Sequence, residues 1–421
     1  MTADILDDLR WRGLVALSTD ETALRAALAA GPITFYCGFD PTSESLQFGN
    51  LVQLVTMRRL QLAGHHPIAV VGGATGLVGD PSGKSAERVL NDVEVVEAWV
   101  ERIRSQISGL LDFEGPNPAR MVNNLEWTGD LSAISFLRDI GKHFPISRML
   151  AKEVVSARLE EGISYTEFSY QILQALDYLE LYRRYGTVLQ TGGSDQWGNL
   201  TAGVDLIRRV EGASVHALAT PLITRADGTK YGKTEVGALW LDPAMTSPYA
   251  FYQYFLNATD ADAGPLLRVF SFRPHEEIVA LEREVAERPG DRRAQQALAE
   301  ELTAVLHGED QAGRVKSASQ AIFGQGDLRD LDEATLRAVA SSLPHAEVDG
   351  EFPGIADLLV ASGLASSRSD ARRTISDGGA YLNNGRMTDA EQRPAATDLL
   401  HGRWLVLRRG KRNVAIVQRP A

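Results

Sequence analysis

Short apolar segments that each lead into a glycine-rich or polar loop and then into a helical pattern recur in the first half of this chain. One is residues 33–37, followed by Gly49-Asn50 and by the apolar spacing of a helix from Leu51 to Leu62. Another is residues 68–71, followed by the glycine-rich segment 72–76 and by an amphipathic helical pattern around 93–111. Alternating units of this kind predict an α/β fold with a parallel sheet flanked by helices.

A third predicted strand, Val188-Leu189-Gln190, ends in the polar segment Gly192 to Gln196. In open parallel sheets ligands bind at the carboxyl ends of the strands, so we expect a binding site at this edge. Residues 131–185 precede this strand and are mostly helical in pattern. They are predicted to form an insertion in the sheet topology that carries a partner surface.

Composition and charge narrow the class of protein. The 421 residues carry 43 Lys and Arg against 55 Asp and Glu, and this net charge of −12 argues against indiscriminate coating of nucleic acid. The segment 401–421 is basic and has no acid, so it is either an RNA contact or a solvated charged tail.

The chain has no apolar run of eighteen residues, and its start is acidic and mixed, so we expect a soluble, untargeted protein. The single cysteine, Cys37, excludes an intrachain disulfide and favours the cytoplasm.

Two loops have the chemistry of a phosphate site. Residues 36–50 lie where a predicted strand meets a helix, and such a junction offers unpaired amides and the positive end of a helix dipole. Residues 227–234 place Lys230 and Lys233 around a glycine, and two ammonium groups could neutralise charge on a departing pyrophosphate. Each segment alone also fits a plain turn or surface loop.

Taken together, these segments resemble the bacterial tyrosyl-tRNA synthetases, which are class I enzymes. Gln47-Phe48-Gly49-Asn50 stands where that family has His-Ile-Gly-His, and residues 230–234 stand where it has Lys-Met-Ser-Lys-Ser. Residues 72–84, 165–177 and 192–199 are also similar, and the likeness runs nearly end to end. The resemblance implies ATP-dependent activation of tyrosine followed by its transfer to tRNA(Tyr).

The resemblance also implies a domain plan. It consists of a Rossmann-like catalytic domain (1–223, with a helical insertion at about 125–185), a mobile lysine loop and linker (224–246), an α-helical domain for the anticodon region of tRNA (247–325), a linker (326–351) and a small α+β RNA-binding domain (352–421). The residues themselves support the last two domains. Residues 247–323 are helical in pattern, and residues 355–361 and 367–376 read as helices followed by strand-like 380–382 and 404–407.

The site residues are carried over by motif. Tyr36 and Asp177 would hydrogen-bond the phenol hydroxyl of tyrosine, and phenylalanine would leave both unpaired. The remaining tyrosine-binding residues would be Asp80, Tyr170 and Gln174 for the ammonium group, Gln196 for the carboxyl group, and Gln190. Spacings of four and three put Tyr170, Gln174 and Asp177 on one helix face. Taken singly, Tyr36 could equally be a core aromatic, and Asp177 a surface acid.

The ATP and catalytic residues follow in the same way, whereas the tRNA residues are taken from the clustered basic side chains of the last domain. The ATP set is Cys37, Gly38, Asp40, Gly49, Gly193 and Asp195. The catalytic set is Thr42, Gln47, Asn50, Lys84, Arg88, Lys230, Lys233 and Thr234. The tRNA set is Arg368, Arg372, Arg373, Arg408, Arg409, Lys411 and Arg412. The attacking carboxylate is already ionised, so no catalytic base is needed, and Mg²⁺ would arrive with ATP without a metal site on the protein.

Both signature histidines are absent, and Gln47 and Asn50 stand in their places. Amide side chains donate N–H bonds as histidine does, but Gln47 has an extra rotatable bond, which predicts slower activation. Two alternatives therefore remain open: a paralogue that binds tyrosine or tRNA without catalysis, and an enzyme that activates a tyrosine-like compound. The resemblance further implies a homodimer with the insertion helices at its interface.

Overall fold

The computed structural model describes residues 4–82, 92–150, 162–234 and 237–420. The chain divides into two compact units. The first comprises residues 1–245 and 261–283, and the second comprises residues 246–260 and 284–421. Within the described ranges, no helix combines the length and apolar character that crossing a membrane requires.

The first unit is built on a six-stranded sheet in the order β1-β6-β5-β2-β3-β4. Its strands are β1 (Leu17–Ser18), β2 (Thr34–Phe39), β3 (His66–Val71), β4 (Arg120–Asn123), β5 (Thr187–Gly193) and β6 (His216–Thr220). All neighbouring pairs are parallel except β1, which runs antiparallel to β6 at the edge. The predicted parallel α/β fold is therefore confirmed.

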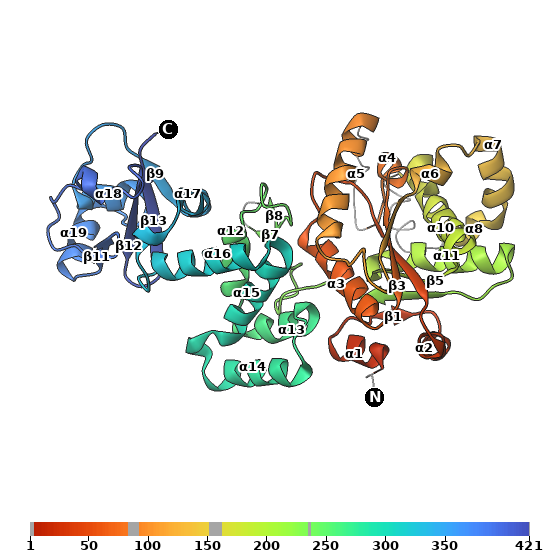
Figure 1. The fold of residues 1–421 in the computed structure, drawn as a ribbon. Helices are drawn as coiled ribbons and strands as arrows, with labels where there is room; N and C mark the ends of the chain where they lie inside the picture. Colours follow the sequence, from red (N-terminus) through yellow and green to blue (C-terminus); the bar gives the residue numbers. More distant parts are fainter. Residues whose placement is uncertain (1–3, 83–91, 151–161, 235–236, 421) are drawn as a thin grey trace. The chain divides into compact units, whose positions relative to one another are not determined.

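Helices cover both faces of this sheet (Figure 1). On one side lie α3 (Phe48–Leu62) and α5 (Val93–Ser108), and on the other lie α10 (Tyr165–Tyr185) and α11 (Trp197–Val210). Tyr36 and Ile68 from the strands share a buried core with Ala175 of α10 and Leu206 of α11. Because side chains alternate along a strand, Cys37 faces α3 instead, and its thiol lies 4.0 Å from Gln53 of that helix.

The strand order reverses between β5 and β2, since β3 and β4 are added on one side of β2 and β6 is added on the far side of β5. At such a reversal the loops that leave the two strands diverge and open a crevice at their carboxyl ends. α10 lies beside this crevice, and both of its ends are capped. Ser164 accepts a hydrogen bond from the Glu167 amide at its start, and Gly186 adopts a left-handed φ of 63° at its close.

Smaller elements complete the first unit: α1 (Ile5–Trp11), α2 (Glu21–Ala30), α4 (Thr75–Val78), α6 (Leu125–Thr128), α7 (Ala133–Ser135), α8 (Ile146–Leu150), the two-stranded sheet of β7 (Lys233–Thr234) and β8 (Gly237–Ala238), α13 (Asp260–Phe270) and most of α14 (His275–Glu287). A π-helical turn at Phe136–Ile140 and a 3₁₀ turn at Gly141–His143 follow α7. The predicted insertion is thus largely helical where the structure describes it, and residues 151–161 lie outside the described ranges.

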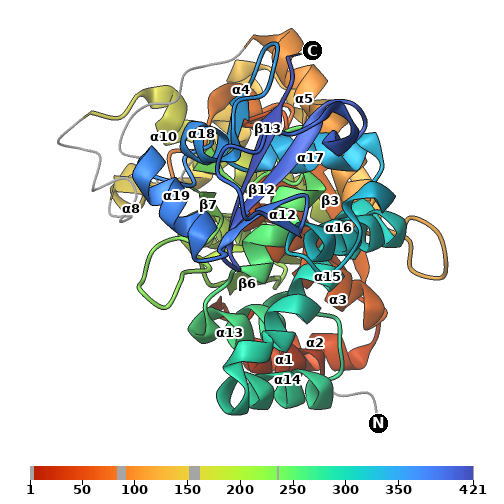
Figure 2. The ribbon, with the colours of Figure 1, turned by 90° about the vertical axis from the view of Figure 1, so that its left-hand side faces the viewer.

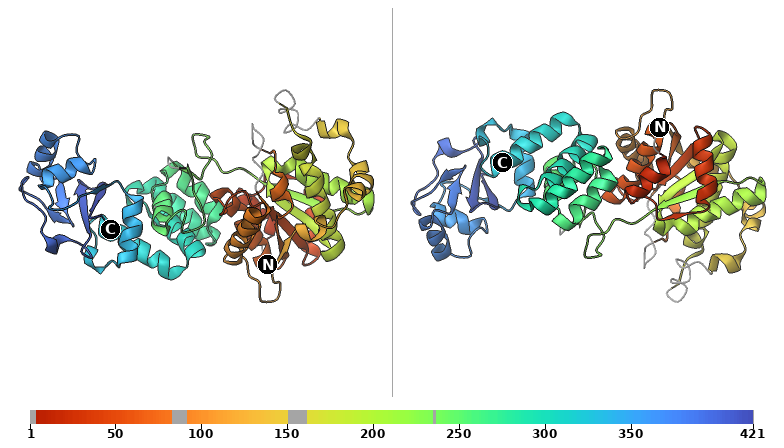
Figure 3. Two further views of the ribbon diagram at one scale, coloured as in Figure 1. Left: turned by 90° about the horizontal axis from the view of Figure 1, so that it is seen from above. Right: turned by 90° about the horizontal axis from the view of Figure 1, so that it is seen from below.

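The second unit begins with packed helices, whereas α13 and most of α14, which lie within the predicted helical range 247–325, belong to the first unit. Figure 3 shows the packed helices grouped together, and they comprise α12 (Pro248–Leu256), α15 (Arg293–His307), α16 (Glu309–Ile322) and α17 (Glu333–Ser342). Ser247 caps α12 by accepting a bond from the Ala250 amide, and Pro248 occupies its first turn. The stretch 326–351, predicted as a linker, carries α17 and the strand β9 (His345–Glu347).

A five-stranded sheet in the order β11-β10-β12-β13-β9 closes the second unit. Figure 2 shows β12 (Trp404–Arg409) and β13 (Asn413–Gln418) side by side within it. The other strands are β10 (Ala380–Leu382) and β11 (Gly385–Arg386), and the helices α18 (Ile355–Ala361) and α19 (Arg368–Ser376) precede them. The predicted helices and two strands are confirmed, while β9, β11 and β13 were not anticipated.

Candidate active site

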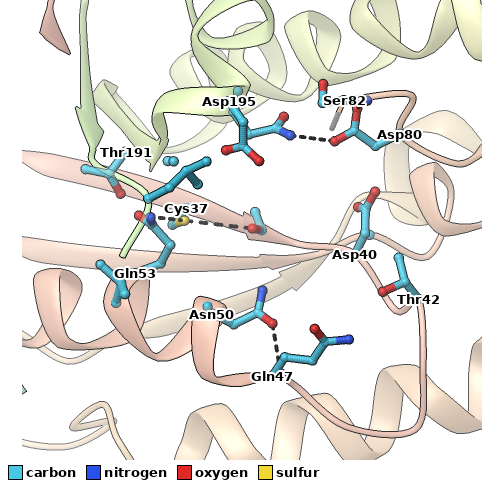
Figure 4. A pocket seen from close by; sticks show the side chains of 18 of the residues that line it. Cys37, Asp40, Thr42, Gln47, Asn50, Gln53, Asp80, Ser82, Thr191 and Asp195 are labelled. Atoms are coloured by element: carbon cyan, nitrogen blue, oxygen red, sulfur yellow. Dashed lines mark hydrogen bonds between the residues drawn. The ribbon is translucent and has the colours of Figure 1, made fainter. Parts of the chain in front are cut away.

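A pocket of about 750 Å³ opens at the carboxyl ends of β2, β3 and β5, beside the start of α3 (Figure 4). Every residue predicted to bind tyrosine or ATP lines it. Thr42, Gln47, Asn50 and Lys230 of the predicted catalytic set line it as well. Lys84 and Arg88 lie outside the described residues, and Lys233 and Thr234 are described only as the backbone of β7.

At the inner end of the pocket, a carboxyl group and a phenol are buried together. Asp177 on α10 is 4% exposed and accepts hydrogen bonds from Trp127 Nε1 at 2.7 Å and from Asn124 Nδ2 at 3.0 Å. Tyr36 on β2 is 1% exposed, and its hydroxyl has no hydrogen-bond partner among the described residues. A buried hydroxyl without a partner costs free energy, so this pair is suited to a ligand that brings its own hydroxyl group.

Burial controls the protonation of this pair. It raises the pKa of Asp177 to about 7, although the bonds from Asn124 and Trp127 oppose the shift. Burial, reinforced by the Asp177 carboxylate, also raises the pKa of Tyr36 well above its usual value. The phenol therefore remains a donor at neutral pH, whereas the carboxyl group is present in both forms.

A hydrogen-bond chain connects this inner end to the middle of the pocket. Asn124 Nδ2 also donates to Thr75 Oγ1 at 2.9 Å, and Thr75 donates to Asp40 Oδ1 at 2.6 Å. The Tyr170 hydroxyl donates to the other Asp40 oxygen at 2.5 Å. The close approach at Asp40 requires glycine at position 72, because a Cβ there would lie 2.0 Å from Asp40 Oδ1.

Acidic groups surround the middle of the pocket. Figure 4 shows the carboxyl groups of Asp40, Asp80 and Asp195 facing the same space. Asp80 accepts from Gln196 Nε2 at 2.5 Å and from the Ser82 amide at 2.9 Å. Burial, and then the charge of Asp80, raises the pKa of Asp195. Such a set of acceptors favours a cationic group such as an ammonium.

The opposite wall is the start of α3. Gln47 is the N-cap residue of α3, and the backbone amide of Gln47 donates a hydrogen bond to Asn50 Oδ1 at 2.9 Å. This bond leaves the amide nitrogen of Asn50 turned toward the pocket, as Figure 4 shows. The first amides of a helix and its dipole attract anions, so this wall suits a phosphate.

The lysine loop is joined to this wall. The Phe48 amide donates to the Leu239 carbonyl and the Leu241 amide donates to the Leu46 carbonyl, both at 2.9 Å. The rings of Phe48 and Tyr231 are 5.6 Å apart. Gly232 has a φ of 84°, and a Cβ there would lie 2.9 Å from the Phe48 side chain. Lys230 is therefore held at the rim of the pocket by contacts between the two signature segments.

Sequence patterns did not identify several residues that build this pocket. Thr75, Asn124 and Trp127 organise its inner end, and Gln53 lies beside Cys37 and donates to Thr220 Oγ1 at 2.6 Å. Burial raises the pKa of the Cys37 thiol to about 12, so the thiol stays protonated. Asn124 and Trp127 lie about fifty residues before Asp177, and their contact is visible only in the fold.

The predicted tRNA-binding residues lie in the second unit and differ in their surroundings. Arg409 is half-buried and binds both oxygens of Asp370, at 2.8 and 2.9 Å. Arg368 pairs with Asp357, Arg372 pairs with Glu391, and Arg408 lies 4.1 Å from the centre of the Tyr381 ring. Arg373, Lys411 and Arg412 are exposed.

Comparison with known proteins defines the class. The family model described as tRNA synthetases class I (W and Y) matches residues 28–324. The chain therefore belongs to this family of class I tRNA synthetases. A second model, described as the tyrosine–tRNA ligase SYY-like C-terminal domain, matches residues 335–417.

Similar proteins narrow the class further. Tyrosine–tRNA ligase of Streptomyces avermitilis is 64% identical over 418 residues, with 99% of each chain covered. Tyrosine–tRNA ligase of Acidothermus cellulolyticus is 59% identical over 421 residues, again with 99% of each covered. A C-terminally truncated mitochondrial tyrosyl-tRNA synthetase of Aspergillus nidulans superimposes with a TM-score of 0.70 at 27% identity, covering 76% of this chain and 94% of that one.

Proposed function

We infer that the chain is a tyrosine–tRNA ligase, which activates tyrosine with ATP, releases pyrophosphate and transfers the tyrosyl group to tRNA(Tyr). The observation that carries this inference is the buried pair Tyr36 and Asp177, at the inner end of a pocket whose outer wall suits phosphate. The full-length similarity to tyrosine–tRNA ligases supports it. Nothing supports the alternative of a paralogue that has lost catalysis.

The pocket would recognise tyrosine at both ends of the molecule. The substrate hydroxyl would donate to Asp177 and accept from Tyr36, which supplies the partner that Tyr36 lacks. Asp80, Tyr170 and Gln174 would hold the ammonium group, and Gln196 the carboxyl group. The buried side-chain oxygen of Gln190 finds no partner within the described ranges, and the same ligand would supply one.

Activation would then depend on position and charge. The tyrosine carboxylate attacks the α-phosphorus of ATP, an oxygen–phosphorus bond forms, and the bond to pyrophosphate breaks. The ribose would lie against Cys37, Gly193 and Asp195, with Gly38 and Gly49 allowing close approach. The phosphates would be faced by Thr42, the backbone amides at the start of α3 and the side-chain nitrogen of Asn50, and the pyrophosphate leaving group by Lys230. The resemblance adds four more residues around the pyrophosphate: Lys84, Arg88, Lys233 and Thr234.

Magnesium would enter with ATP and share the charge of its phosphates. In the parts of the chain that the structure describes, no three His, Cys, Asp or Glu side chains cluster to hold a metal ion. We propose that the phosphates carry the ion, while the residues of this chain position the nucleotide.

Gln47 and Asn50 are proposed to fill the role of the two signature histidines. The side-chain N–H group of Asn50 is an oriented donor, because the side-chain oxygen of the same residue accepts a hydrogen bond from the backbone amide of Gln47. The Gln47 side chain has more rotational freedom and would be ordered only in the transition state, so activation would be slower than with histidine.

A homodimer is proposed from an exposed apolar surface on the insertion. Ile134, Leu137, Ile146 and Tyr165 all lie on the predicted insertion, and they are 72%, 51%, 65% and 64% exposed. Large apolar side chains left exposed in one part of a chain favour an interface there. Sedimentation of the wild-type chain at twice the monomer mass, and dissociation of an Ile146→Asp variant, are expected; a wild-type monomer would contradict the proposal.

The tRNA would bind the second unit. The exposed side chains that would contact the tRNA phosphate backbone are Arg373, Lys411 and Arg412. The arginines that already contact other side chains would shape the binding surface, and these are Arg368, Arg372, Arg408 and Arg409. The decisive assay supplies tyrosine, ATP and magnesium and measures exchange of labelled pyrophosphate into ATP, then charging of tRNA(Tyr). Both reactions are expected. Tyrosine binding without exchange would favour a binding protein, and exchange without charging would favour activation of tyrosine for another purpose.

A further inference from the structure

The segment that carries Lys230 is a short hairpin with its own internal bonds. The Tyr231 amide donates to the Ile223 carbonyl at 2.9 Å, and Thr224 and Lys230 form an antiparallel bridge. At its tip the Gly228 amide donates to the Arg225 carbonyl at 2.9 Å, which closes a turn with Ala226 at its second position. These bonds tie Lys230 to the rest of the hairpin, so the orientation of the hairpin decides where Lys230 points.

The base of this hairpin is fixed by Tyr231 and Gly232 against Phe48. Its tip is held separately, because the Ala226 amide donates to Asp262 Oδ1 at 2.8 Å. Asp262 lies on α13 and is 6% exposed, whereas Ala226 is exposed. A buried carboxylate on α13 therefore accepts a hydrogen bond from the backbone of an exposed loop.

The same helix also contacts the signature segment. Phe270 at the end of α13 lies 4.7 Å, ring to ring, from Phe48 at the start of α3. α13 therefore touches both the tip of the hairpin and the element that forms the phosphate wall. A hydrogen bond from an amide to a carboxylate is stronger than a bond between neutral groups, so Asp262 is well suited to fix the hairpin against this frame.

We propose that Asp262 is a positioning residue for the activation step, which holds the hairpin through Ala226 so that Lys230 faces the phosphates. The inference rests on the proposed function and deepens it. Without this bond the hairpin would sample orientations that carry Lys230 away from the pocket. The tyrosine site would be unaffected, because Tyr36 and Asp177 lie on β2 and α10.

Two variants remove the bond from its two sides. Asp262→Ala removes the acceptor, and Ala226→Pro removes the donor at a turn position that favours proline. Each is expected to lower kcat/KM for ATP in pyrophosphate exchange roughly tenfold, while the tyrosine dissociation constant stays unchanged. Asp262→Asn keeps an acceptor oxygen and is expected to recover most of the activity.

The matched control is Glu282→Ala. Glu282 on α14 accepts hydrogen bonds of 2.6 and 2.7 Å from Arg268 on α13, the helix that carries Asp262. Its loss therefore perturbs α13 without touching the hairpin. This variant is expected to keep wild-type exchange kinetics. A loss equal to that of Asp262→Ala would show that any damage to α13 has this effect, and would overturn the proposal.

A double-mutant cycle identifies Lys230 as the group through which Asp262 acts. In a Lys230→Ala background, Asp262→Ala is expected to have no further effect on exchange. An undiminished tenfold effect there, or wild-type kinetics in both Asp262→Ala and Ala226→Pro, would overturn the proposal. If the wild-type chain itself exchanged no pyrophosphate, the proposed function would fail instead, so the two failures are distinguishable.

Discussion

The indole N–H of Trp127 donates a hydrogen bond of 2.7 Å to Asp177 Oδ1, and this bond fixes the carboxyl group at the inner end of the pocket. Asn124 binds the other oxygen at 3.0 Å, so the orientation of the carboxyl group is set before any substrate arrives. Groups that are held in advance in this way lose less free energy on binding. If Asp177 binds the hydroxyl of tyrosine as proposed, recognition of tyrosine also depends on the residues that orient this carboxyl group.

Trp127→Phe tests this dependence. Phenylalanine keeps an aromatic ring beneath Arg184, which lies 5.3 Å from the centre of the Trp127 ring, and removes only the donor. We expect KM for tyrosine to rise roughly tenfold with little change in KM for ATP. Because the Trp127 bond lowers the pKa of Asp177, the pH dependence of tyrosine binding should also move upward. An unchanged pH dependence would contradict the account.

Tyr36→Phe is expected to stabilise the free protein while it impairs function. In the part of the chain that the structure describes, the buried Tyr36 hydroxyl has no hydrogen-bond partner, so its removal relieves a desolvation cost of about 1 kcal/mol. Urea unfolding of the ligand-free chain measures this change. A destabilised Tyr36→Phe variant would show that the hydroxyl has a partner in the free protein.

Stability should depend on pH through Asp177. Burial raises its pKa from 3.8 to about 7, so the folded chain holds a proton that the unfolded chain releases. The stabilising contribution is complete below the unfolded value and is lost as pH rises through about 7. An Asp177→Asn variant does not titrate there, so wild type should lose on the order of 4 kcal/mol relative to it between pH 4 and pH 8. Parallel stability profiles for the two proteins would contradict the raised pKa.

Gln47→His restores one signature histidine. A ring with fewer rotatable bonds needs less ordering before it donates to phosphate, so the rate of tyrosyl-adenylate formation should rise by roughly tenfold. Single-turnover measurement of adenylate formation isolates this step. Equal rates in the two proteins would mean that Gln47 is already ordered or takes no part.

Much of the catalytic fold follows from local pattern. β2, β3 and β5 are runs of apolar or β-branched residues that end in glycine or polar segments, so their edge and its role could be predicted. β6 was not anticipated because its sequence, His-Ala-Leu-Ala-Thr, has little β-propensity, and burial between neighbours makes it a strand. β13 was obscured by the basic residues around it, although Val414 to Val417 are buried.

The site residues also fall into those that the sequence could predict and those that it could not. Residues within motifs, such as Tyr36 and Asp177, could be assigned by resemblance, and the pocket gathers them. Trp127 and Asp262 could not, because each acts on a residue far along the chain through a contact that only the tertiary fold creates. Local sequence gives no signal of such contacts, since neither the tryptophan nor the aspartate lies in a pattern that identifies its distant partner.

The central claim is that Tyr36 and Asp177 select a ring that carries a hydroxyl group. Pyrophosphate exchange with tyrosine and with phenylalanine, in wild type and in Tyr36→Phe, tests it most directly. We predict that wild type strongly prefers tyrosine in kcat/KM and that Tyr36→Phe lowers this preference by roughly tenfold or more. Equal preference in the two proteins, or comparable use of phenylalanine by wild type, would contradict the account.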